Sequence, residues 1–535
     1  MGNVNRYVKD YKQYENFEGW EKLSFGEQLR NWSRLYGDKI AVIEEDKQIT
    51  YIELDEKIDE LAFGLRDIGI KVNDNIVLQL PNRISMVIAF FAISRAGAVP
   101  IMVLPAHREA ELEGIFNLAK PTAYIIPERY LGYDYTQMAD KLKDKHSSVK
   151  HVIVDGEEGE TLLKDIKGKK KVLPELNSYK TGVLLLSGGT TGSPKLIPRT
   201  HTDYIYNAKT AAKHCRLDQN SVYLTVLPAA HNFSLSCPGI LGTLSSGGRV
   251  VMSKTPSPDI ALPLIQKEKV TIIALVPAML GVFMEMLEED KSYDLSSLEI
   301  LQVGGAMLED KLAEEVIETW PCKLQQVFGT AEGLICFTAL DDSKEIITSC
   351  QGKPISEADE IKIVDKQGLP VADGVYGELL ARGPYTIDSY YKAAEANKKS
   401  FTEEGYYCTG DRAMITKEGN IRIGGRIKEQ INRAGEKIMP AEIETYLLEY
   451  PDVKEAIVIG ILDQNLGERT CAFLLTRDDV KIELSALHQF LENIGVARYK
   501  MPDQVEFVDM WPVTSVGKID KKELAQRVQT RTICK

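Results

Sequence analysis

The sequence has few of the features that mark redox, metal-binding or disulfide-stabilised proteins. Its 535 residues include 8 cysteines, and no two of them are spaced as Cys-x-x-Cys. Such pairs are typical of structural zinc sites and dithiol redox sites, and a chain of this length needs no disulfide framework to form a core. We therefore expect reduced thiols in a cytosolic enzyme.

An excess of positive charge is also lacking. The chain has 65 Lys and Arg residues against 78 Asp and Glu residues, which gives a net charge of -13 at pH 7. Proteins that bind nucleic acids need clustered basic side chains to neutralise the phosphates. The composition therefore predicts no nucleic-acid partner.

Long uninterrupted apolar runs are missing as well. Residues 1–20 contain no apolar segment of the kind found in signal peptides, and Arg6 stands where myristoylation requires Ser or Thr. The most apolar stretch, 86–105, is interrupted by Arg95 and Pro100, which favours a buried helix followed by a strand over a membrane span. We expect a cytoplasmic protein with no membrane association.

The sequence does contain a regular alternation of strand-like and helical segments as far as about residue 350. This alternation predicts an α/β fold with largely parallel sheets. The predicted helices include 84–97 and 108–119. The predicted strands are 38–45, 74–80, 98–104, 122–127, 151–155, 221–228, 248–253, 271–277 and 299–305.

After residue 350 the pattern changes. Segments 360–383 and 405–426 read as short strands joined by glycine turns, which predicts a meander or a small β-barrel. A compact α+β pattern follows, with helices at 440–450 and 483–495 and strands at 455–461 and 470–476. We therefore expect a large N-terminal domain, 1–427, made of two α/β subdomains and a small β-barrel, and a mobile α+β C-terminal domain, 428–535.

The segment SGGTTGSPK, 187–195, has the composition of a phosphate-binding loop. A Walker loop needs a Gly-x-x-x-x-Gly-Lys-[Ser/Thr] spacing before a helix, whereas Pro194 precedes Lys195 here and Pro198 opposes a helix. We predict a flexible loop between two strands, in which backbone N–H groups and hydroxyls wrap an anion and Lys195 supplies positive charge. The hydroxyls belong to Ser187, Thr190, Thr191 and Ser193.

The motif TTGSPK followed by PRTH resembles the phosphate loop of the adenylate-forming superfamily, which includes acyl-CoA synthetases, luciferases and the adenylation domains of peptide synthetases. The resemblance implies ATP as a substrate and extends over nearly the full chain, with further motifs in the family's order. The nucleotide-binding positions that it implies in this loop are Ser187, Gly188, Thr190, Thr191, Gly192 and Lys195.

Three further motifs resemble nucleotide-binding elements of the same family. FGTAEG implies that Glu332 holds Mg²⁺, with Ala331 in place of the usual threonine, as in the branch that activates aryl acids. VGGA resembles the segment that lies against adenine, and the TGD element implies that Asp411 accepts hydrogen bonds from the ribose hydroxyls. The remaining implied nucleotide-binding residues are Gly304, Gly305, Ala306, Phe328, Gly329 and Thr330.

The C-terminal motifs resemble those that link the two half-reactions of the family. In the segment 424–444 the resemblance implies ribose contact for Arg426, a hinge at Lys428, and close approach of a pantetheine arm at Gly435. PVTSVGKIDKKEL implies that Lys518 is the catalytic lysine, which bridges the substrate carboxylate and the ATP phosphate. The implied reaction forms an acyl-AMP and pyrophosphate, then transfers the acyl group to a thiol as the small domain turns.

The segment LPAAHNFSLSCPG indicates the acid. Amino-acid-activating domains have Asp where Asn232 stands, and a neutral amide can instead bond a phenolic hydroxyl ortho to a carboxylate. The pattern resembles the stand-alone aryl-acid ligases of siderophore biosynthesis, which load 2,3-dihydroxybenzoate or salicylate onto an aryl carrier protein, and His231 is a further candidate catalytic residue. Cys237, in place of Ser, and Ile335, in place of Val, favour salicylate. The predicted pocket comprises Asn232, Phe233, Cys237, Val327, Ala331 and Ile335.

Two alternatives share these motifs. An aryl- or acyl-CoA ligase has the same core elements, and the His-Asn-Phe sequence argues against it. A catalytically inactive nucleotide-binding relative is disfavoured because the chemically important residues are retained. These residues are Lys195, Glu332, Asp411, Arg426 and Lys518.

Overall fold

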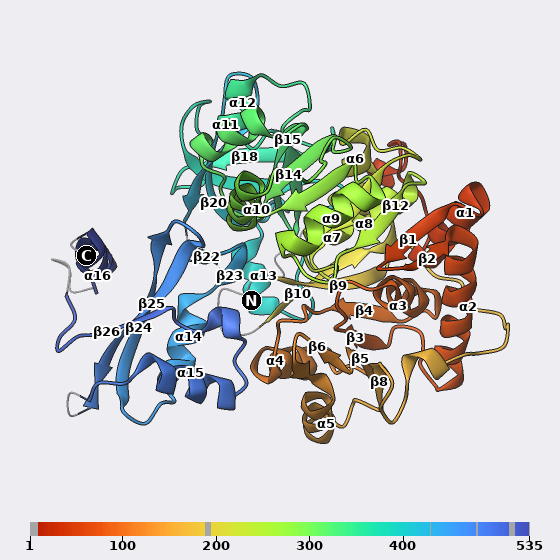
Figure 1. Ribbon diagram of the computed structural model, residues 1–535, viewed down its shortest axis with the longest axis horizontal. Coiled ribbons are helices and arrows are strands. Elements are labelled where there is room, and N and C mark those ends of the chain that lie inside the picture. The colour runs from red at the N-terminus through yellow and green to blue at the C-terminus, as the bar shows by residue number, and fades with distance from the viewer. Residues whose placement is uncertain (1–8, 188–193, 428–429, 478–479, 513–518, 534–535) are drawn as a thin grey trace.

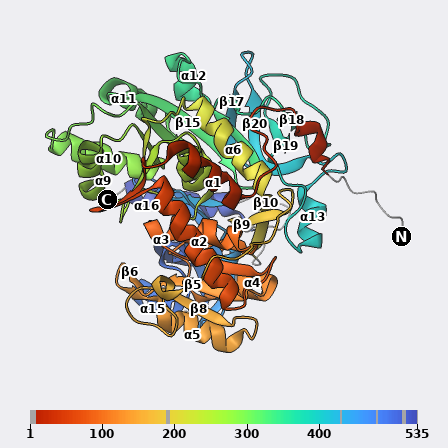
Figure 2. The same ribbon diagram turned by 90° about the vertical axis from the view of Figure 1, so that its right-hand side faces the viewer.

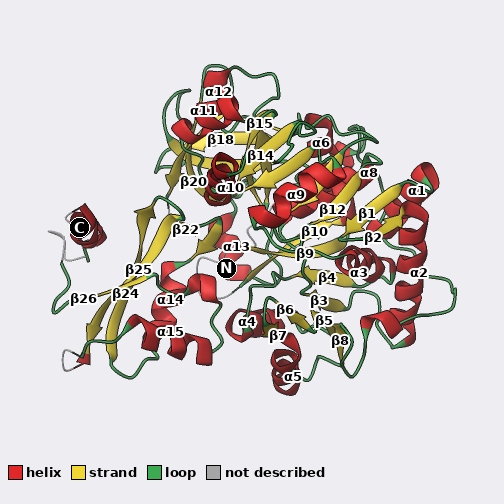
Figure 3. Ribbon diagram, viewed as in Figure 1, coloured by secondary structure: helices red, strands yellow, loops and turns green. Residues whose placement is uncertain are grey.

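The computed structural model describes residues 9–187, 194–427, 430–477, 480–512 and 519–533. Two large sheets with helices packed on them form most of the molecule, and a smaller α+β unit lies to one side (Figures 1 and 3). The start of the described chain lies beside the segment that follows residue 350 (Figure 2), where Lys9 donates a hydrogen bond to the carbonyl oxygen of Pro384. The predicted mixed α/β architecture with a large N-terminal and a small C-terminal part is confirmed.

The first sheet has six strands in the order β10-β9-β4-β3-β5-β8, parallel except for the β9–β10 hairpin. Its two faces enter different apolar cores, since Ile76 and Leu78 pack on one side and Val77 on the other. Helices cover both faces, as a parallel sheet requires. The strands are β3 (Asn75–Leu78), β4 (Val99–Met102), β5 (Ala123–Pro127), β8 (His151–Asp155), β9 (Thr181–Ser187) and β10 (Lys195–Thr200). The neighbouring helices are α2 (Tyr51–Asp67), α3 (Ile84–Arg95), α4 (Glu109–Ala119) and α5 (Tyr135–Lys145).

The second sheet has nine strands in the order β17-β16-β15-β14-β13-β11-β12-β1-β2. It is parallel from β15 to β1, and antiparallel strands close both edges. The strands are β1 (Ile40–Glu44), β2 (Lys47–Thr50), β11 (Val222–Thr225), β12 (Arg249–Met252), β13 (Ile272–Leu275), β14 (Ile300–Gly304), β15 (Lys323–Thr330), β16 (Gly333–Phe337) and β17 (Lys353–Pro354). The helices are α1 (Phe25–Tyr36), α6 (His201–His214), α7 (Asn232–Ser236), α8 (Gly239–Ser245), α9 (Pro258–Glu268), α10 (Pro277–Glu289), α11 (Asp310–Thr319) and α12 (Lys344–Ser349).

The segment 86–105 forms a buried helix, α3, followed by the buried strand β4, as predicted from its interruptions. Across the part of the chain that the structure describes, no helix is long and apolar enough to cross a membrane. None of the 7 cysteines within the described ranges forms a disulfide.

The segment after residue 350 forms an antiparallel meander in the order β18-β19-β20-β21. Of the two predicted arrangements, the meander is the one observed, because within the described residues β18 and β21 remain the edges of an open four-stranded sheet rather than closing a barrel. Its elements are β18 (Glu360–Val364), β19 (Gly377–Arg382), α13 (Ala394–Ser400), β20 (Tyr407–Ile415) and β21 (Ile421–Arg426).

The C-terminal unit is built on a sheet with the order β23-β22-β25-β24, to which β26 adds in parallel. Side chains alternate across it, so Val458 and Leu474 pack with α14 and α15, while Ile459 and Phe473 pack with α16 on the opposite face. The elements are β22 (Ile431–Arg433), β23 (Glu436–Ile438), α14 (Pro440–Leu447), β24 (Val453–Asp463), β25 (Gly467–Thr476), α15 (Leu484–Asn493), β26 (Gln504–Phe507) and α16 (Lys521–Ile533).

A buried ion cluster joins the two parts of the chain. Lys500 Nζ lies 3.2 Å from Glu111 Oε1, on α4 of the large part, and 2.6 Å from Glu442 Oε1, on α14 of the small part. Lys500 and Glu111 are only 7% and 6% exposed. The Ala110 backbone N–H also donates to the carbonyl oxygen of Gly495. The cluster therefore fixes the face that the C-terminal unit turns toward the large part, and α16 lies on the far side (Figure 1).

Candidate functional site

A cavity of about 830 Å³ opens where both large sheets meet the C-terminal unit. Strand ends, α7 and the β22–β23 turn contribute to its wall, so the topology brings together segments that are distant in sequence. This is the region where parallel sheets present their ligand-binding loops. The predicted site residues that line it are Ser187, Lys195, His231, Asn232, Phe233, Cys237, Gly305, Val327, Gly329, Thr330, Ala331, Glu332, Ile335 and Gly435.

The phosphate-loop prediction rests on two strands that the structure describes. Ser187 ends β9 and Lys195 begins β10, and the two residues pair directly in the antiparallel hairpin. Lys195 is buried in the cavity wall, and its Nζ atom lies 5.0 Å from the centre of the Tyr390 ring. The chain between the two strands therefore starts and ends at the cavity. Gly188, Thr190, Thr191 and Gly192 lie outside the described residues.

Glu332 places a carboxylate in the cavity between β15 and β16. It is 7% exposed, and its Oε1 atom accepts a hydrogen bond of 2.8 Å from the Tyr390 hydroxyl. Burial, reinforced by the charge of Glu332, raises the pKa of Tyr390 above its usual value, so the hydroxyl keeps its proton and donates. The carboxylate is thereby held in one orientation.

The surroundings of Glu332 fit a cation that is shared with phosphate. Within the described ranges, no group of three or more His, Cys, Asp or Glu side chains could hold a metal ion by itself. Mg²⁺ is usually bound by one or two carboxylates together with substrate phosphates and water. The buried Glu332 carboxylate shares the cavity wall with Lys195, which is consistent with that arrangement.

The helix α7 carries the predicted acid-recognition residues. His231 is its N-cap residue, and the His231 Nδ1 atom accepts a hydrogen bond of 3.2 Å from the Phe233 backbone N–H. Desolvation by the surrounding cavity wall, with a smaller effect of Lys437, lowers the pKa of His231 to about 4, which favours the neutral imidazole. Since Nδ1 accepts, the ring proton resides on Nε2, and His231 is a hydrogen-bond donor at that atom.

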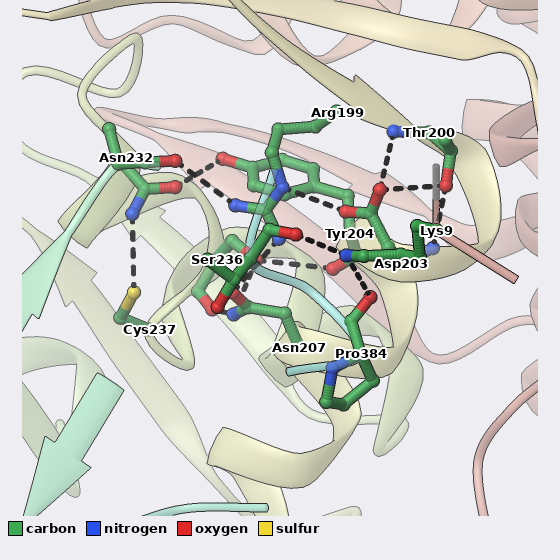
Figure 4. Close-up of polar contacts among 12 residues, drawn as sticks. Lys9, Arg199, Thr200, Asp203, Tyr204, Asn207, Asn232, Ser236, Cys237 and Pro384 are labelled. Atoms are coloured by element: carbon green, nitrogen blue, oxygen red, sulfur yellow. Dashed lines mark hydrogen bonds and ion pairs between the residues drawn. The ribbon is translucent and has the colours of Figure 1, made fainter. Parts of the chain in front are cut away.

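Asn232 and Cys237 lie beside each other in the cavity wall (Figure 4). The Asn232 Nδ2 atom is 3.7 Å from Cys237 Sγ, and Asn232 Oδ1 accepts a hydrogen bond of 2.9 Å from the Tyr204 hydroxyl. Burial raises the pKa of Cys237 to about 12, so the thiol is protonated and is not a nucleophile. Cys237 therefore serves as a small, weakly polar wall of the pocket.

Apolar side chains and close backbone packing shape the rest of this pocket. A Cβ atom on Gly304 would lie 2.6 Å from the Val327 carbonyl oxygen and 3.3 Å from Phe233 Cε1. Gly304 is thus needed for β14 to approach β15 and α7. Val327, Ala331 and Ile335 complete the wall.

Several predicted nucleotide-binding residues lie next to the cavity rather than in its wall. Asp411 is buried beside the lining residue Gly410, and it pairs in register with Arg426 on β21. Phe328 is partly buried against the core of the meander, because alternate side chains of β15 point to opposite faces. Gly304, Ala306, Phe328 and Asp411 are the residues in this group.

The C-terminal unit presents the β22–β23 turn to the cavity. Gly435 has φ +88°, and a Cβ atom there would lie 2.8 Å from Val276 Cγ1 of the large part. Lys428 and Lys518 lie outside the described residues. Ile519, which follows Lys518, packs with α16 on the face of the C-terminal sheet opposite the α14–α15 side.

Sequence motifs did not reveal every residue of the wall. Tyr390, which positions Glu332, lies in a segment without a recognisable pattern. Lys437 also lines the cavity, and its place two residues after Gly435 in a motif of the family could have revealed it. Tyr204 touches Asn232 from a different helix, a contact that only the fold creates.

Comparisons with known proteins agree with this geometry. The family model described as AMP-binding enzyme matches residues 29–391, and the AMP-binding enzyme C-terminal domain matches residues 442–518. The chain belongs to the AMP-binding enzyme family. The predicted resemblance to adenylate-forming enzymes is thereby confirmed.

Curated relatives and a solved structure extend over nearly the whole chain. A "2,3-dihydroxybenzoate-AMP ligase" of Bacillus subtilis is 47% identical over 515 residues, which cover 96% of this chain and 95% of that protein. A "Salicyl-AMP ligase / salicyl-S-ArCP synthetase" of Mycobacterium tuberculosis is 39% identical over 522 residues, which cover 96% of this chain and 92% of that protein. The apo structure of MbtA from Mycobacterium smegmatis is 40% identical in sequence, with a TM-score of 0.74. The match covers 96% of this chain and 97% of that chain.

Proposed function

We propose that the protein is an ATP-dependent aryl-acid–AMP ligase of siderophore biosynthesis that activates salicylate in preference to 2,3-dihydroxybenzoate. The observation that carries the proposal is the placing of Asn232 and Cys237 in one cavity with Lys195 and Glu332. An amide donor for an ortho oxygen thus shares a cavity with the groups suited to ATP phosphates. The names of the two relatives, which between them include both acids, support the substrate class.

In the first half-reaction, the carboxylate of the acid attacks the α-phosphate of ATP and pyrophosphate leaves. Lys195 and the loop 188–193 would hold the phosphates, while Asp411 would hold the ribose. Glu332 would hold Mg²⁺, which supplies charge neutralisation on the phosphate oxygens. Lys518 would bridge the attacking carboxylate and the phosphate, so the protein contributes mainly position and electrostatic stabilisation.

In the second half-reaction, the aryl group passes to the phosphopantetheine thiol of an aryl carrier protein, and AMP leaves. We infer that the chain divides into a domain 1–427 and a mobile domain 428–535 that turns about Lys428 between the half-reactions. The present orientation, with Gly435 in the cavity wall and α16 far from it, supports assignment to the thiol-transfer state.

Carboxylate-dependent ATP–pyrophosphate exchange tests the proposal. We expect exchange with salicylate and weaker exchange with 2,3-dihydroxybenzoate, and background exchange with amino acids, which lack a carboxylate counter-charge for their ammonium group in this site. Absence of exchange with both hydroxybenzoates would contradict the proposal. Measuring acyl transfer to CoA and to a phosphopantetheinylated carrier protein distinguishes the proposed ligase from an aryl-CoA ligase.

Changing Cys237 to Ser is expected to shift the preference toward 2,3-dihydroxybenzoate by about fivefold. A hydroxyl can bond the 3-hydroxyl of that acid more strongly than a thiol can, and one such hydrogen bond contributes about 1 kcal/mol. The measurement is kcat/KM for both acids in pyrophosphate exchange. The buried Cys215→Ser variant is the control, because Cys215 bonds Gln325 away from the cavity. An unchanged ratio for the Cys237 variant would remove the basis for the salicylate assignment.

A further inference from the structure

We propose that Tyr204 is a positioning residue that fixes the amide of Asn232 with its N–H₂ group toward the acid, so that the site selects aryl acids whose ortho substituent accepts a hydrogen bond. The inference rests on the proposed function and deepens it, because it defines the chemistry of the ortho group. Tyr204 lies outside the cavity wall and acts through Asn232.

The contacts of Asn232 give its amide a direction. Its Oδ1 atom accepts the Tyr204 hydroxyl hydrogen bond at 2.9 Å, and its Nδ2 atom points toward Cys237 Sγ at 3.7 Å (Figure 4). Sulfur is a weak acceptor at that distance. The oxygen end of the amide is thus engaged by the protein, while the nitrogen end keeps donor capacity for a ligand.

The Tyr204 ring is held in place by its burial and by its contact with Arg199. It is fully buried, and the Arg199 guanidinium carbon lies 4.8 Å from its centre. Arg199 is itself fully buried, and its Nε atom donates to Asp203 Oδ1 at 2.7 Å. The Asp203 carboxylate also caps the start of α6 by accepting from Thr200. Moving the ring would therefore disturb a buried ion pair, which is costly.

A second set of contacts ties α6 to α7 and to the pocket floor. The Asn207 Nδ2 atom donates to the Ser236 carbonyl oxygen at 2.7 Å, and Arg199 Nη1 donates to the Ala331 carbonyl oxygen at 3.3 Å. The helix that carries Tyr204 is thus fixed relative to both Asn232 and the acid pocket. The position of the hydroxyl is set by the scaffold rather than by a ligand.

The Tyr204 hydroxyl determines which end of the amide it binds. Burial raises the pKa of Tyr204 above its usual value, so the group remains a protonated phenol with a proton to donate. With Asn232 Oδ1 facing it, that proton has an acceptor at 2.9 Å. If the amide were turned over, its N–H group would donate to the hydroxyl oxygen instead, and the buried hydroxyl proton would lose Asn232 Oδ1 as its acceptor, which is unfavourable.

A donor at this position discriminates among ortho substituents. The hydroxyl of salicylate gives its proton to its own carboxylate, so its oxygen faces the protein as an acceptor. Benzoate has no group there. The amine of 2-aminobenzoate presents N–H groups, because its lone pair is delocalised into the ring, and two facing donors leave both unsatisfied.

The test is Tyr204→Phe, assayed by pyrophosphate exchange with salicylate, benzoate and 2-aminobenzoate. We expect kcat/KM for salicylate to fall about tenfold and that for benzoate to change less than about twofold. The value for 2-aminobenzoate should rise, since the freed amide can turn its oxygen to the amine. The control is Tyr206→Phe, which removes a buried hydroxyl on the same helix that lies 2.8 Å from Ser356 Oγ.

The acids distinguish positioning from a general structural role. A loss of the same size with salicylate and benzoate, or an unchanged ratio of salicylate to 2-aminobenzoate, would overturn the inference. Because wild-type exchange with salicylate is measured in the same series, failure of the proposed function appears separately, as absence of exchange before any substitution. The Tyr206 variant should keep the wild-type ratios.

Discussion

Replacing Lys518 with Ala is expected to slow formation of the aryl adenylate by about 100- to 1,000-fold, the range found when one preorganised charge-stabilising donor is removed. In the proposed mechanism, Lys518 would supply the cation that bridges the acid and the phosphate in the transition state. Transfer from preformed aryl-AMP to a thiol should stay within about twofold, because the present orientation places α16 on the far side of the C-terminal sheet. Pyrophosphate exchange and single-turnover thioester formation measure the two steps.

The matched control is Lys521→Ala, which removes the same charge from the same segment at the start of α16. It should leave both half-reactions near the wild-type rate. If Lys518→Ala kept the full adenylation rate, the assigned role of Lys518 would be wrong.

Replacing Gly435 with Val is expected to affect the other half-reaction from Lys518→Ala. Thiol transfer should become about 100-fold slower, while adenylation should be nearly unchanged. A side chain at this position would meet Val276 and narrow the cavity, and small misplacements of reacting groups cost about that much. Single-turnover transfer from purified enzyme-bound aryl-AMP gives the rate of the affected step.

Gly467→Val serves as the control for backbone strain. Gly467 has φ +75° in the same unit, so valine is strained there too, but the nearest atom to its Cβ would be the Asn432 carbonyl oxygen at 3.6 Å, and Gly467 is not part of the cavity wall. Equal loss of transfer in both variants would attribute the effect to strain in the domain rather than to the cavity.

Much of the scaffold could be predicted from local sequence because its signals are local. The β-branched runs of the two parallel sheets became β3, β4, β5 and β11–β14, and Pro198 lies in β10 rather than in a helix. The interruption of 86–105 correctly predicted α3 followed by β4. The local sequence could not predict whether the strands after residue 350 close into a barrel, because closure depends on edge pairing between distant strands.

The candidate site was predictable where it coincides with contiguous motifs. Asn232, Cys237, Glu332 and Lys195 were found in this way, and the fold brings them to one cavity. Residues that act through tertiary contact were missed, because Tyr204 and Tyr390 reach their partners from other elements. Single-sequence patterns contain no information about such pairs.

The buried ion cluster between the two parts of the chain has a consequence for turnover. Glu442 lies on the same unit as Lys500, so if the C-terminal domain turns, the cation keeps one carboxylate partner throughout. Glu111 would lose Lys500 and the Ala497 N–H, but it retains the Arg108 backbone N–H that its Oε2 atom accepts at 2.8 Å. Neither charge is therefore stranded without a partner, and separating the surfaces avoids most of the penalty of breaking a buried ion pair. In the proposed domain rotation, the cluster would hold one orientation and then separate with a carboxylate partner left for Lys500 and an N–H partner left for Glu111.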